Sequence, residues 1–297
     1  MAENALIISE VFKAGWAGFK KNMKYFIVTY LAYLVTAIVI SALFMAVVFA
    51  VIMPSLYSGS EAAKITGGLL AAVVYFVFYV VIIFLVMYYA LSITKASIWT
   101  AANKALSYGA ILKHKAGYYF KFFGICILYC LAIFIPVCVL GAIFAAISVA
   151  AYYLAGSMAA IITGAVLGLV LIIAFLFLSI IFWPVQFMAA DEDCKLNVVD
   201  MFKTSWKSVK AKLGSVILFW IALIAIAIAA YAVFGIIGAV IYFGLASYLN
   251  TMTTIIALYA YVIIAGILIN IFVGMPILVS VGAAYKKITE GKLTPNN

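Results

Sequence analysis

The chain has 297 residues, of which 70% are hydrophobic and only 9% are charged. In a water-soluble domain about half of the residues are apolar and about a quarter are charged. This composition therefore excludes a water-soluble domain and predicts a protein surrounded by lipid. The formal net charge is +10, and all 18 basic residues are Lys; without the planar Arg fork, we expect contact with anionic lipid headgroups and no nucleic-acid partner.

The first predicted element is an amphipathic helix over residues 4–24. Its core, EVFKAGWAGFKKNM, places Phe12 and Trp16 on one helical face and Lys13 and Lys20 on another. A helix with an apolar stripe and a cationic stripe lies along a membrane surface rather than across it.

Two membrane spans are predicted next, at about 25–53 and 69–92, because each apolar stretch is long enough to cross a bilayer. The polar turn between them contains Glu61 and Lys64. A second Lys-bearing interfacial helix is predicted over residues 95–118, with a break at Gly109.

Residues 122–190 contain no charge. Three crossings would put the Lys-rich ends of this stretch on opposite faces, against the positive-inside bias, so two spans are predicted at about 122–154 and 158–188. The turn is expected near Gly156, and Pro136 and Pro184 are expected to kink the two helices.

The cationic helix pattern then repeats over residues 197–212, with Asn197 as its expected N-cap. At a constant offset of 190 residues, Lys203, Trp206 and Lys210 align with Lys13, Trp16 and Lys20. Lys207 lies on the same cationic face. The last two spans are predicted at about 213–246 and 254–284, with a turn near 247–254.

These elements predict an all-α integral membrane protein whose single polytopic domain covers residues 1–297. Six transmembrane helices form three hairpins, each preceded by a Lys-bearing interfacial helix. By this layout 17 of the 18 Lys lie on one side and Lys64 on the other. The asymmetry predicts a cell-membrane protein with both termini in the cytoplasm.

One segment resembles a known family. Phe182–Leu218 reads FWPVQFMAADEDCKLNVVDMFKTSWKSVKAKLGSVIL, in which a span ends at a Pro, acidic residues follow, and a helix of the form F-K-x-S-W-x-x-x-K leads into the next span. This resembles the six-span proteins related to the membrane domain of glycerophosphodiester phosphodiesterases, and Thr100–Leu112, TAANKALSYGAIL, also looks like their short Ala-rich helix. The resemblance implies a membrane fold and a lipid-associated setting. It does not imply phosphodiesterase activity, which in that family belongs to a separate soluble domain.

The sequence offers few groups for catalysis, so we expect no enzyme activity, no cofactor and no metal. His114, the single His, lies between two Lys in a predicted solvated loop without an orienting partner. The acidic cluster Asp191, Glu192 and Asp193 is expected to offset the charge of Lys residues near it in sequence; weak cation binding is the alternative. The nearby Lys are Lys195, Lys203 and Lys207.

Seven residues on the two amphipathic helices are expected to contact anionic lipid headgroups or a protein partner. They are Lys13, Trp16, Lys20, Lys203, Trp206, Lys207 and Lys210. The partner could also be a second copy of the chain in a homo-oligomer. Asn270 shares a helical face with Gly266 and Gly274 deep in the last span. Two roles are open for it, a hydrogen bond between packed helices or a place in the wall of a ligand cavity.

Two functions follow from these patterns. The first is a non-catalytic membrane protein that engages lipid or a partner through its Lys-bearing interfacial helices. The alternative is a transporter or channel-like protein for a lipid-like or small uncharged solute. A cavity that reaches Asn270 would favour the alternative, and a solidly packed bundle would count against it.

Overall fold

The computed structural model describes residues 8–246 and 251–290, and all regular structure in these ranges is helical. Part of the predicted turn at 247–254 and the start of the predicted 4–24 helix lie outside the described residues. In chain order the elements are α1 (Ile8–Val47), the π-helical η1 (Val48–Ile52), α2 (Met53–Leu56), α3 (Glu61–Ala101), α4 (Tyr108–Leu112), α5 (Ala116–Ala190), α6 (Val198–Ala211), α7 (Leu213–Ala246), α8 (Thr251–Ile269), the π-helical η2 (Asn270–Gly274) and α9 (Met275–Thr289).

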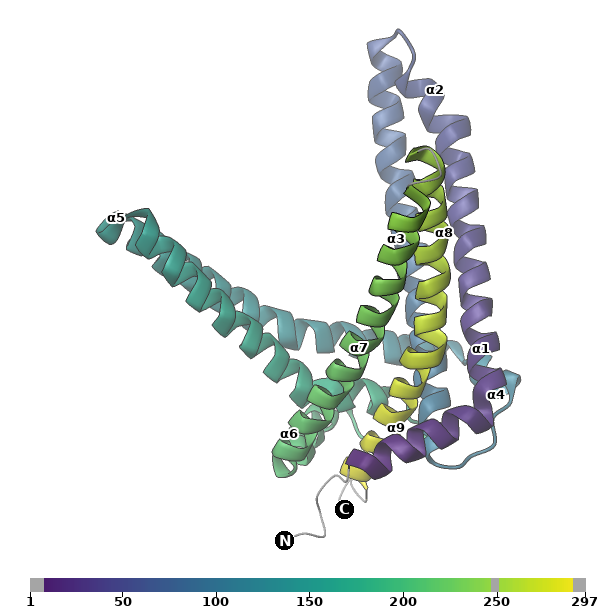
Figure 1. Cartoon of the computed structure of the whole chain (residues 1–297), viewed down its shortest axis with the longest axis vertical. Helices are drawn as coiled ribbons and strands as arrows, with labels where there is room; N and C mark the ends of the chain where they lie inside the picture. Colours follow the sequence, from purple (N-terminus) through teal and green to yellow (C-terminus); the bar gives the residue numbers. More distant parts are fainter. Residues whose placement is uncertain (1–7, 247–250, 291–297) are drawn as a thin grey trace.

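Among the described residues, five helices are long and apolar enough to cross a membrane, which confirms the predicted all-α membrane class. The longest, α5, has 75 residues and consists of two halves joined at Gly156. Gly156 has φ 85°, in the left-handed region that a residue without a Cβ adopts readily. Figure 1 shows the two halves lying side by side, so α5 is a helical hairpin that turns where the sequence predicted a turn.

The long helices form a V (Figure 1). The upright arm contains α1, α3, α7 and α8, and the leaning arm is the α5 hairpin. The arms meet in a base formed by the C-terminal ends of α3 and α5, by α6 and α9, and by the first part of α1. Buried side chains concentrate there, including Leu91 of α3, Met188 of α5, Met201 of α6 and Tyr285 of α9. Away from the base the helices expose apolar side chains, as surfaces that face lipid do.

Small residues bring the helices of the base into close contact. A Cβ built on Gly15 of α1 would lie 2.0 Å from Ser280 Oγ and 2.8 Å from Ser280 Cα of α9. On the opposite side of α9, a Cβ on Gly282 would lie 2.9 Å from the backbone oxygen of Ser97 in α3. Helices in membranes associate through such close approaches, and here they fix α9 between α1 and α3.

The segment 95–118, predicted as an interfacial helix with a break at Gly109, is divided among the end of α3, α4 and the start of α5. Lys95 to Ile98 are buried as the end of α3, because this last part of the helix enters the base. Asn103, with φ 54°, follows the end of α3. Ser107 caps the five-residue α4 by accepting a hydrogen bond from the Ala110 N–H, and α5 begins only at Ala116.

Candidate functional site

A cavity of about 550 Å³ lies between the two arms of the V, next to the base. Its volume lies in the range of small-molecule sites, roughly 300–1,000 Å³. The wall comes from α3, both halves of α5, α7, η2 and α9, and none of the described lining residues is charged. They are Tyr89, Ile93, Tyr129, Leu176, Ser179, Ile180, Trp183, Gln186, Phe187, Trp220, Ile224, Asn270, Gly274, Met275, Ile277, Leu278 and Val281.

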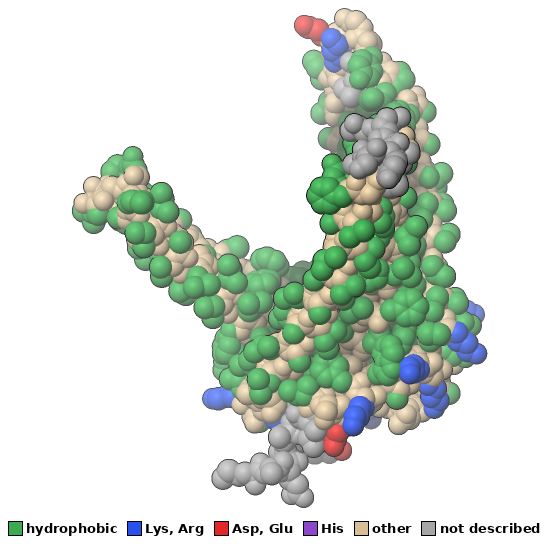
Figure 2. Space-filling model, viewed as in Figure 1, with side chains coloured by type: hydrophobic (Ala, Val, Ile, Leu, Met, Phe, Trp, Pro, Cys, Tyr) green, Lys and Arg blue, Asp and Glu red, His purple; other side chains and the backbone are tan. Residues whose placement is uncertain are grey.

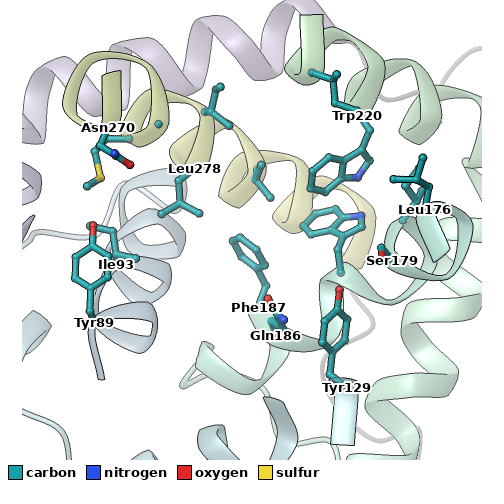
Figure 3. Close-up of a pocket in the computed structure, with 17 residues that line it drawn as sticks. Tyr89, Ile93, Tyr129, Leu176, Ser179, Gln186, Phe187, Trp220, Asn270 and Leu278 are labelled. Carbon is teal, nitrogen blue, oxygen red and sulfur yellow. The ribbon is translucent and has the colours of Figure 1, made fainter. Parts of the chain in front are cut away.

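Polar side chains lie at several places around the cavity. Figure 3 shows Asn270 and Tyr89 at one end, and Tyr129, Ser179 and Trp220 at the other. Apolar side chains, among them Leu278, lie between the two ends. A molecule that fills this space therefore meets mainly hydrocarbon and a few polar side chains, among them Gln186 between the two sides.

Two indole groups at the Trp220 end lack hydrogen-bond partners. Nε1 of Trp183 and Nε1 of Trp220 are buried and have no acceptor among the described residues. The two rings meet edge to face, with centroids 6.1 Å apart. Trp183 is 5% exposed, so bulk water does not reach it.

Asn270 lies in the cavity wall and is exposed there. Its Nδ2 donates to the backbone oxygen of Gly266, 2.9 Å away in the preceding turn of the same chain segment. Of the two roles predicted for Asn270, the structure shows a place in the cavity wall, and this hydrogen bond lies within its own segment. η2 begins at Asn270, and π-helical turns of this kind occur often at functional sites.

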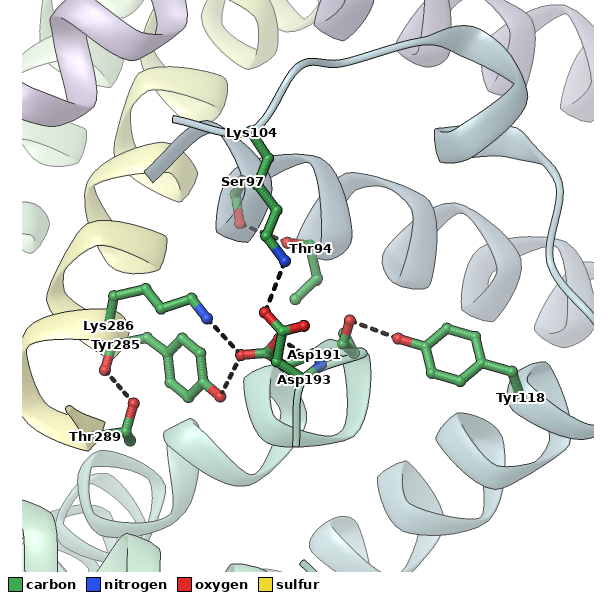
Figure 4. Close-up of polar contacts among 10 residues, drawn as sticks. Thr94, Ser97, Lys104, Tyr118, Asp191, Asp193, Tyr285, Lys286 and Thr289 are labelled. Atoms are coloured by element: carbon green, nitrogen blue, oxygen red, sulfur yellow. Dashed lines mark hydrogen bonds and ion pairs between the residues drawn. The ribbon is translucent and has the colours of Figure 1, made fainter. Parts of the chain in front are cut away.

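Beneath the cavity a buried carboxylate ties α5 to α9 (Figure 4). Asp191, which is 4% exposed, accepts hydrogen bonds from Lys286 Nζ at 2.8 Å and from the Tyr285 hydroxyl at 3.0 Å. The neighbouring Tyr118 hydroxyl donates to the backbone oxygen of Ala190 at 2.5 Å. These bonds join the end of the α5 hairpin to α9 and to the hairpin's own beginning.

The other two acids of the cluster reach α3 and the turn that follows it. Glu192 lies 2.7 Å from Nζ of Lys95, whose side chain is 5% exposed, and Asp193 lies 2.7 Å from Nζ of Lys104. This hydrogen bond raises the pKa of Lys104 and lowers the pKa of Asp193, while partial burial opposes both shifts.

The predicted pairing of the acids with Lys residues near them in sequence is corrected by these contacts. Their partners, Lys95, Lys104 and Lys286, come from distant segments that the fold brings to the base. A sequence signal existed and was missed. Lys95, Asp191 and Lys286 are each the first charged residue after an apolar span, so hairpin ends that meet at one level bring them together.

His114 also differs from its prediction as a solvated loop residue. It is half-buried, its Nε2 lies 2.9 Å from Ser92 Oγ, and its Nδ1 is buried without a partner among the described residues. Burial, with a smaller effect from Lys95, lowers the pKa of His114 to about 4. It is therefore neutral at physiological pH and packs the loop before α5 against α3.

The seven predicted lipid or partner contacts lie on the surface of α1 and α6. Trp16 is 45% exposed and Trp206 42%, and the five Lys of the set are exposed as well. Among the described residues, no ion pair of 4.0 Å or less involves any of these five Lys. Both tryptophans nevertheless touch other aromatic rings, Trp16 contacting Phe19 and Trp206 contacting Phe182.

The buried residues of α6 lie beside its two aromatic side chains, Phe202 and Trp206. Met201, Ser205 and Val209 face the core, and Ser205 Oγ donates to the backbone oxygen of Ile181 at 2.7 Å. The ring of Phe202 lies 5.4 Å from that of Phe182. Asn197 does cap α6, accepting from the Asp200 N–H at 2.9 Å.

Comparison with known proteins finds no matching family model, no matching curated protein and no matching solved structure. The resemblance to the membrane domain of glycerophosphodiester phosphodiesterases stays a prediction. Within the described residues, no group of three or more His, Cys, Asp or Glu is arranged to hold a metal ion.

Proposed function

We propose that this chain is a non-catalytic, multi-pass membrane protein that binds a lipid-like or other uncharged molecule between its two arms. The cavity carries the proposal, because it is large enough for a small ligand, lacks charge in its described lining and includes Asn270. The proposal is related to the alternative predicted from the sequence, a transporter or channel-like protein for a lipid-like or small uncharged solute.

The proposal includes a topology of six spans, with α5 counted as two. The base then lies at the cytoplasmic surface of the cell membrane together with both termini, because positive charge is retained on that side. Figure 2 supports this arrangement, since on the face shown the basic side chains gather at the base. The far tip, where α2 and α3 meet, carries a basic and an acidic side chain, in the region of Lys64 and Glu61.

The test is to fill the cavity and measure what the protein retains. Leu176→Trp adds bulk to the cavity wall, and Leu128→Trp is its matched control, since both Leu are on α5, both are 46% exposed and only Leu176 lines the cavity. We expect native mass spectrometry of gently extracted protein to show a retained molecule in the wild type and in Leu128→Trp, and several-fold less in Leu176→Trp. Equal retention in all three would overturn the proposal.

A second function is favoured by the repeated cationic stripes. Lys13, Lys20, Lys203, Lys207 and Lys210 are exposed on the two amphipathic helices. We propose that they hold anionic lipid headgroups against the base, or alternatively an acidic protein partner. Each Lys near an anionic surface contributes about 1 kcal/mol of attraction. The two functions are compatible, because the cavity and the stripes involve different residues.

A further inference from the structure

A second cavity lies beside the first part of α1, and we call it the α1 groove. Its volume is about 310 Å³, near the lower end of the range of small-molecule sites. Its wall includes Phe12 and Trp16 of α1, Ile226 of α7, Phe272 of η2 and Ser280 of α9. None of the described lining residues is charged, and the Ser280 hydroxyl already donates to the backbone oxygen of Pro276, 2.9 Å away. The groove therefore suits a hydrocarbon chain.

The groove extends from α1 along the membrane-spanning helices. The ring centroids of Phe12 and Phe219 lie 5.6 Å apart, so α7 passes α1 at this level. Ile226 follows Phe219 by seven residues, or roughly 10 Å along α7. Ser280 of α9 meets α1, and Phe272 lies about two helical turns before it in the chain. Both walls thus leave α1 in the direction of the long helices, which is the direction that an acyl chain takes in a bilayer (Figure 1).

Positive charge lies at the α1 end of the groove. Lys13 precedes Trp16 by three residues and Lys20 follows it by four, spacings that make side chains neighbours on a helix. Nζ of Lys20 lies 5.2 Å from the centre of the Trp16 ring, which itself lines the groove. Both Lys are exposed, and within the described chain neither forms an ion pair of 4.0 Å or less. The α1 end of the groove therefore attracts an anion.

The repeated helix α6 provides a comparison. Lys203, Trp206 and Lys210 occupy the positions that match Lys13, Trp16 and Lys20. The Trp206 ring, however, packs against Phe182 of α5 at 6.4 Å and belongs to the described lining of neither cavity. The two helices thus share a cationic stripe, but only the stripe of α1 adjoins the α1 groove.

We infer that the α1 groove is a site for one anionic phospholipid. An acyl chain lies in the groove along α7 and η2, and the phosphate lies at the α1 end beside Lys13 and Lys20. A phospholipid joins a hydrocarbon chain to a negative charge in one molecule, whereas an acidic protein segment supplies the charge without the chain. The inference rests on the function proposed for the cationic stripes, and it adds one stoichiometric site and the class of lipid that occupies it.

A competition between two lipids with the same chains tests the headgroup. We would add dioleoyl phosphatidylglycerol and dioleoyl phosphatidylcholine in equal amounts to the full-length protein in detergent. Leu176→Trp is present in every protein compared, so that the cavity between the arms does not contribute. Native mass spectrometry measures the ratio of the two lipids in the species that holds a single lipid. We expect phosphatidylglycerol to be favoured roughly 25-fold, since each of the two Lys contributes about fivefold.

The repeat supplies the matched control for charge. Lys13→Gln/Lys20→Gln should lower the ratio to within about threefold of unity, because both cations at the groove are removed. Lys203→Gln/Lys210→Gln removes the same charge from the matching positions of α6 and should leave the ratio within about twofold of that of the parent protein.

A second pair of variants tests the place of the acyl chain. Ile226→Trp adds bulk to the wall of the α1 groove, and Ile237→Trp is its control. Both Ile are on α7, they are 42% and 43% exposed, and only Ile226 lines the groove. We expect several-fold less retained phosphatidylglycerol in Ile226→Trp and no change in Ile237→Trp.

The outcomes separate this inference from the function on which it rests. An equal fall of the ratio in the two Lys variants, or unchanged retention in Ile226→Trp, would overturn the inference and leave the stripes as a general anionic-lipid surface. A ratio near unity in the parent protein, or one that neither Lys variant changes, would overturn both the inference and the lipid role of the stripes.

Discussion

Asp191 shows how a charge is accommodated at the membrane end of this fold. The side chain is 4% exposed, and a lone buried carboxylate would be strongly unfavourable. One carboxylate oxygen accepts from Lys286 and Tyr285, and the other accepts from the Asp193 N–H. The residue thus holds the end of α5 against α9 with each of its oxygens satisfied.

Replacing Asp191 tests this role. In Asp191→Asn the amide still meets the Tyr285 hydroxyl, but Lys286, whose side chain is 25% exposed, loses its counter-charge. We expect a loss of about 2 kcal/mol in unfolding free energy, below the usual range for a fully buried pair because Lys286 reaches some solvent.

Asp193→Asn is the matched control, since its pair with Lys104 is largely exposed and should contribute less than about 1 kcal/mol. Thermal unfolding of the purified variants in one detergent measures both changes. Equal losses in the two variants would contradict the assignment of Asp191 as the principal anchor.

At the scale of elements, the 190-residue repeat acquires a structural meaning. The buried residues Val11, Gly15 and Phe19 of α1 match Met201, Ser205 and Val209 of α6 at that offset. Each helix presents a small residue to a neighbouring helix, Gly15 to α9 and Ser205 to α5. The repeat therefore preserves a way of packing as well as a cationic stripe.

The Gly15 contact gives a prediction about helix spacing. Gly15→Ala would place its methyl group 2.0 Å from Ser280 Oγ and 2.8 Å from Ser280 Cα, so α1 and α9 must separate. We expect a loss of roughly 1–3 kcal/mol in unfolding free energy, as for other overpacked contacts.

Gly214→Ala is the control because nothing lies within 4 Å of its added Cβ, and Ala favours the helix by about 1 kcal/mol over Gly. Adding Ser280→Ala to Gly15→Ala should recover part of the loss only, since the backbone contact remains. A neutral Gly15→Ala in thermal unfolding would show that α1 is not held against α9.

At the scale of the whole molecule, charge and shape are arranged along one axis. The basic side chains of the face shown in Figure 2 gather at the base, and apolar side chains cover the arms that rise from it. The cavity lies where the arms diverge, close to the charged base.

Removing the α6 Lys stripe should weaken the hold on anionic lipid. For Lys203→Gln/Lys207→Gln/Lys210→Gln we expect a loss of up to about 3 kcal/mol of attraction, at about 1 kcal/mol per Lys. Spin-labelled phosphatidylglycerol in vesicles that contain the protein measures this loss. Weaker attraction reduces the fraction of labelled lipid whose motion the protein restricts. Lys64→Gln, on the opposite tip, controls for net charge, and an equal effect from it would contradict the role of the stripe.

The sequence by itself determined the class of this protein and much of its layout. Long apolar stretches in a chain with 9% charged residues have no stable alternative to membrane helices. In lipid, the backbone N–H and C=O groups find no water, so they must form hydrogen bonds within each segment. The turn at Gly156 and the cap at Asn197 were also predictable, since local conformation depends on nearby residues.

Only the tertiary structure decided which distant groups meet. The ends of the apolar spans place Asp191 and Lys286 at one level of the membrane, but the sequence does not say that these two side chains pair. Apolar helices look alike in sequence, so nothing in it set Trp183 against Trp220. The cavity is likewise a product of the angle between the two arms, and residues from five separate stretches of the described chain line it. The physical reason is that local pattern sets where each helix forms, whereas the contacts between helices depend on close packing and buried charge pairs formed only when the whole chain is folded.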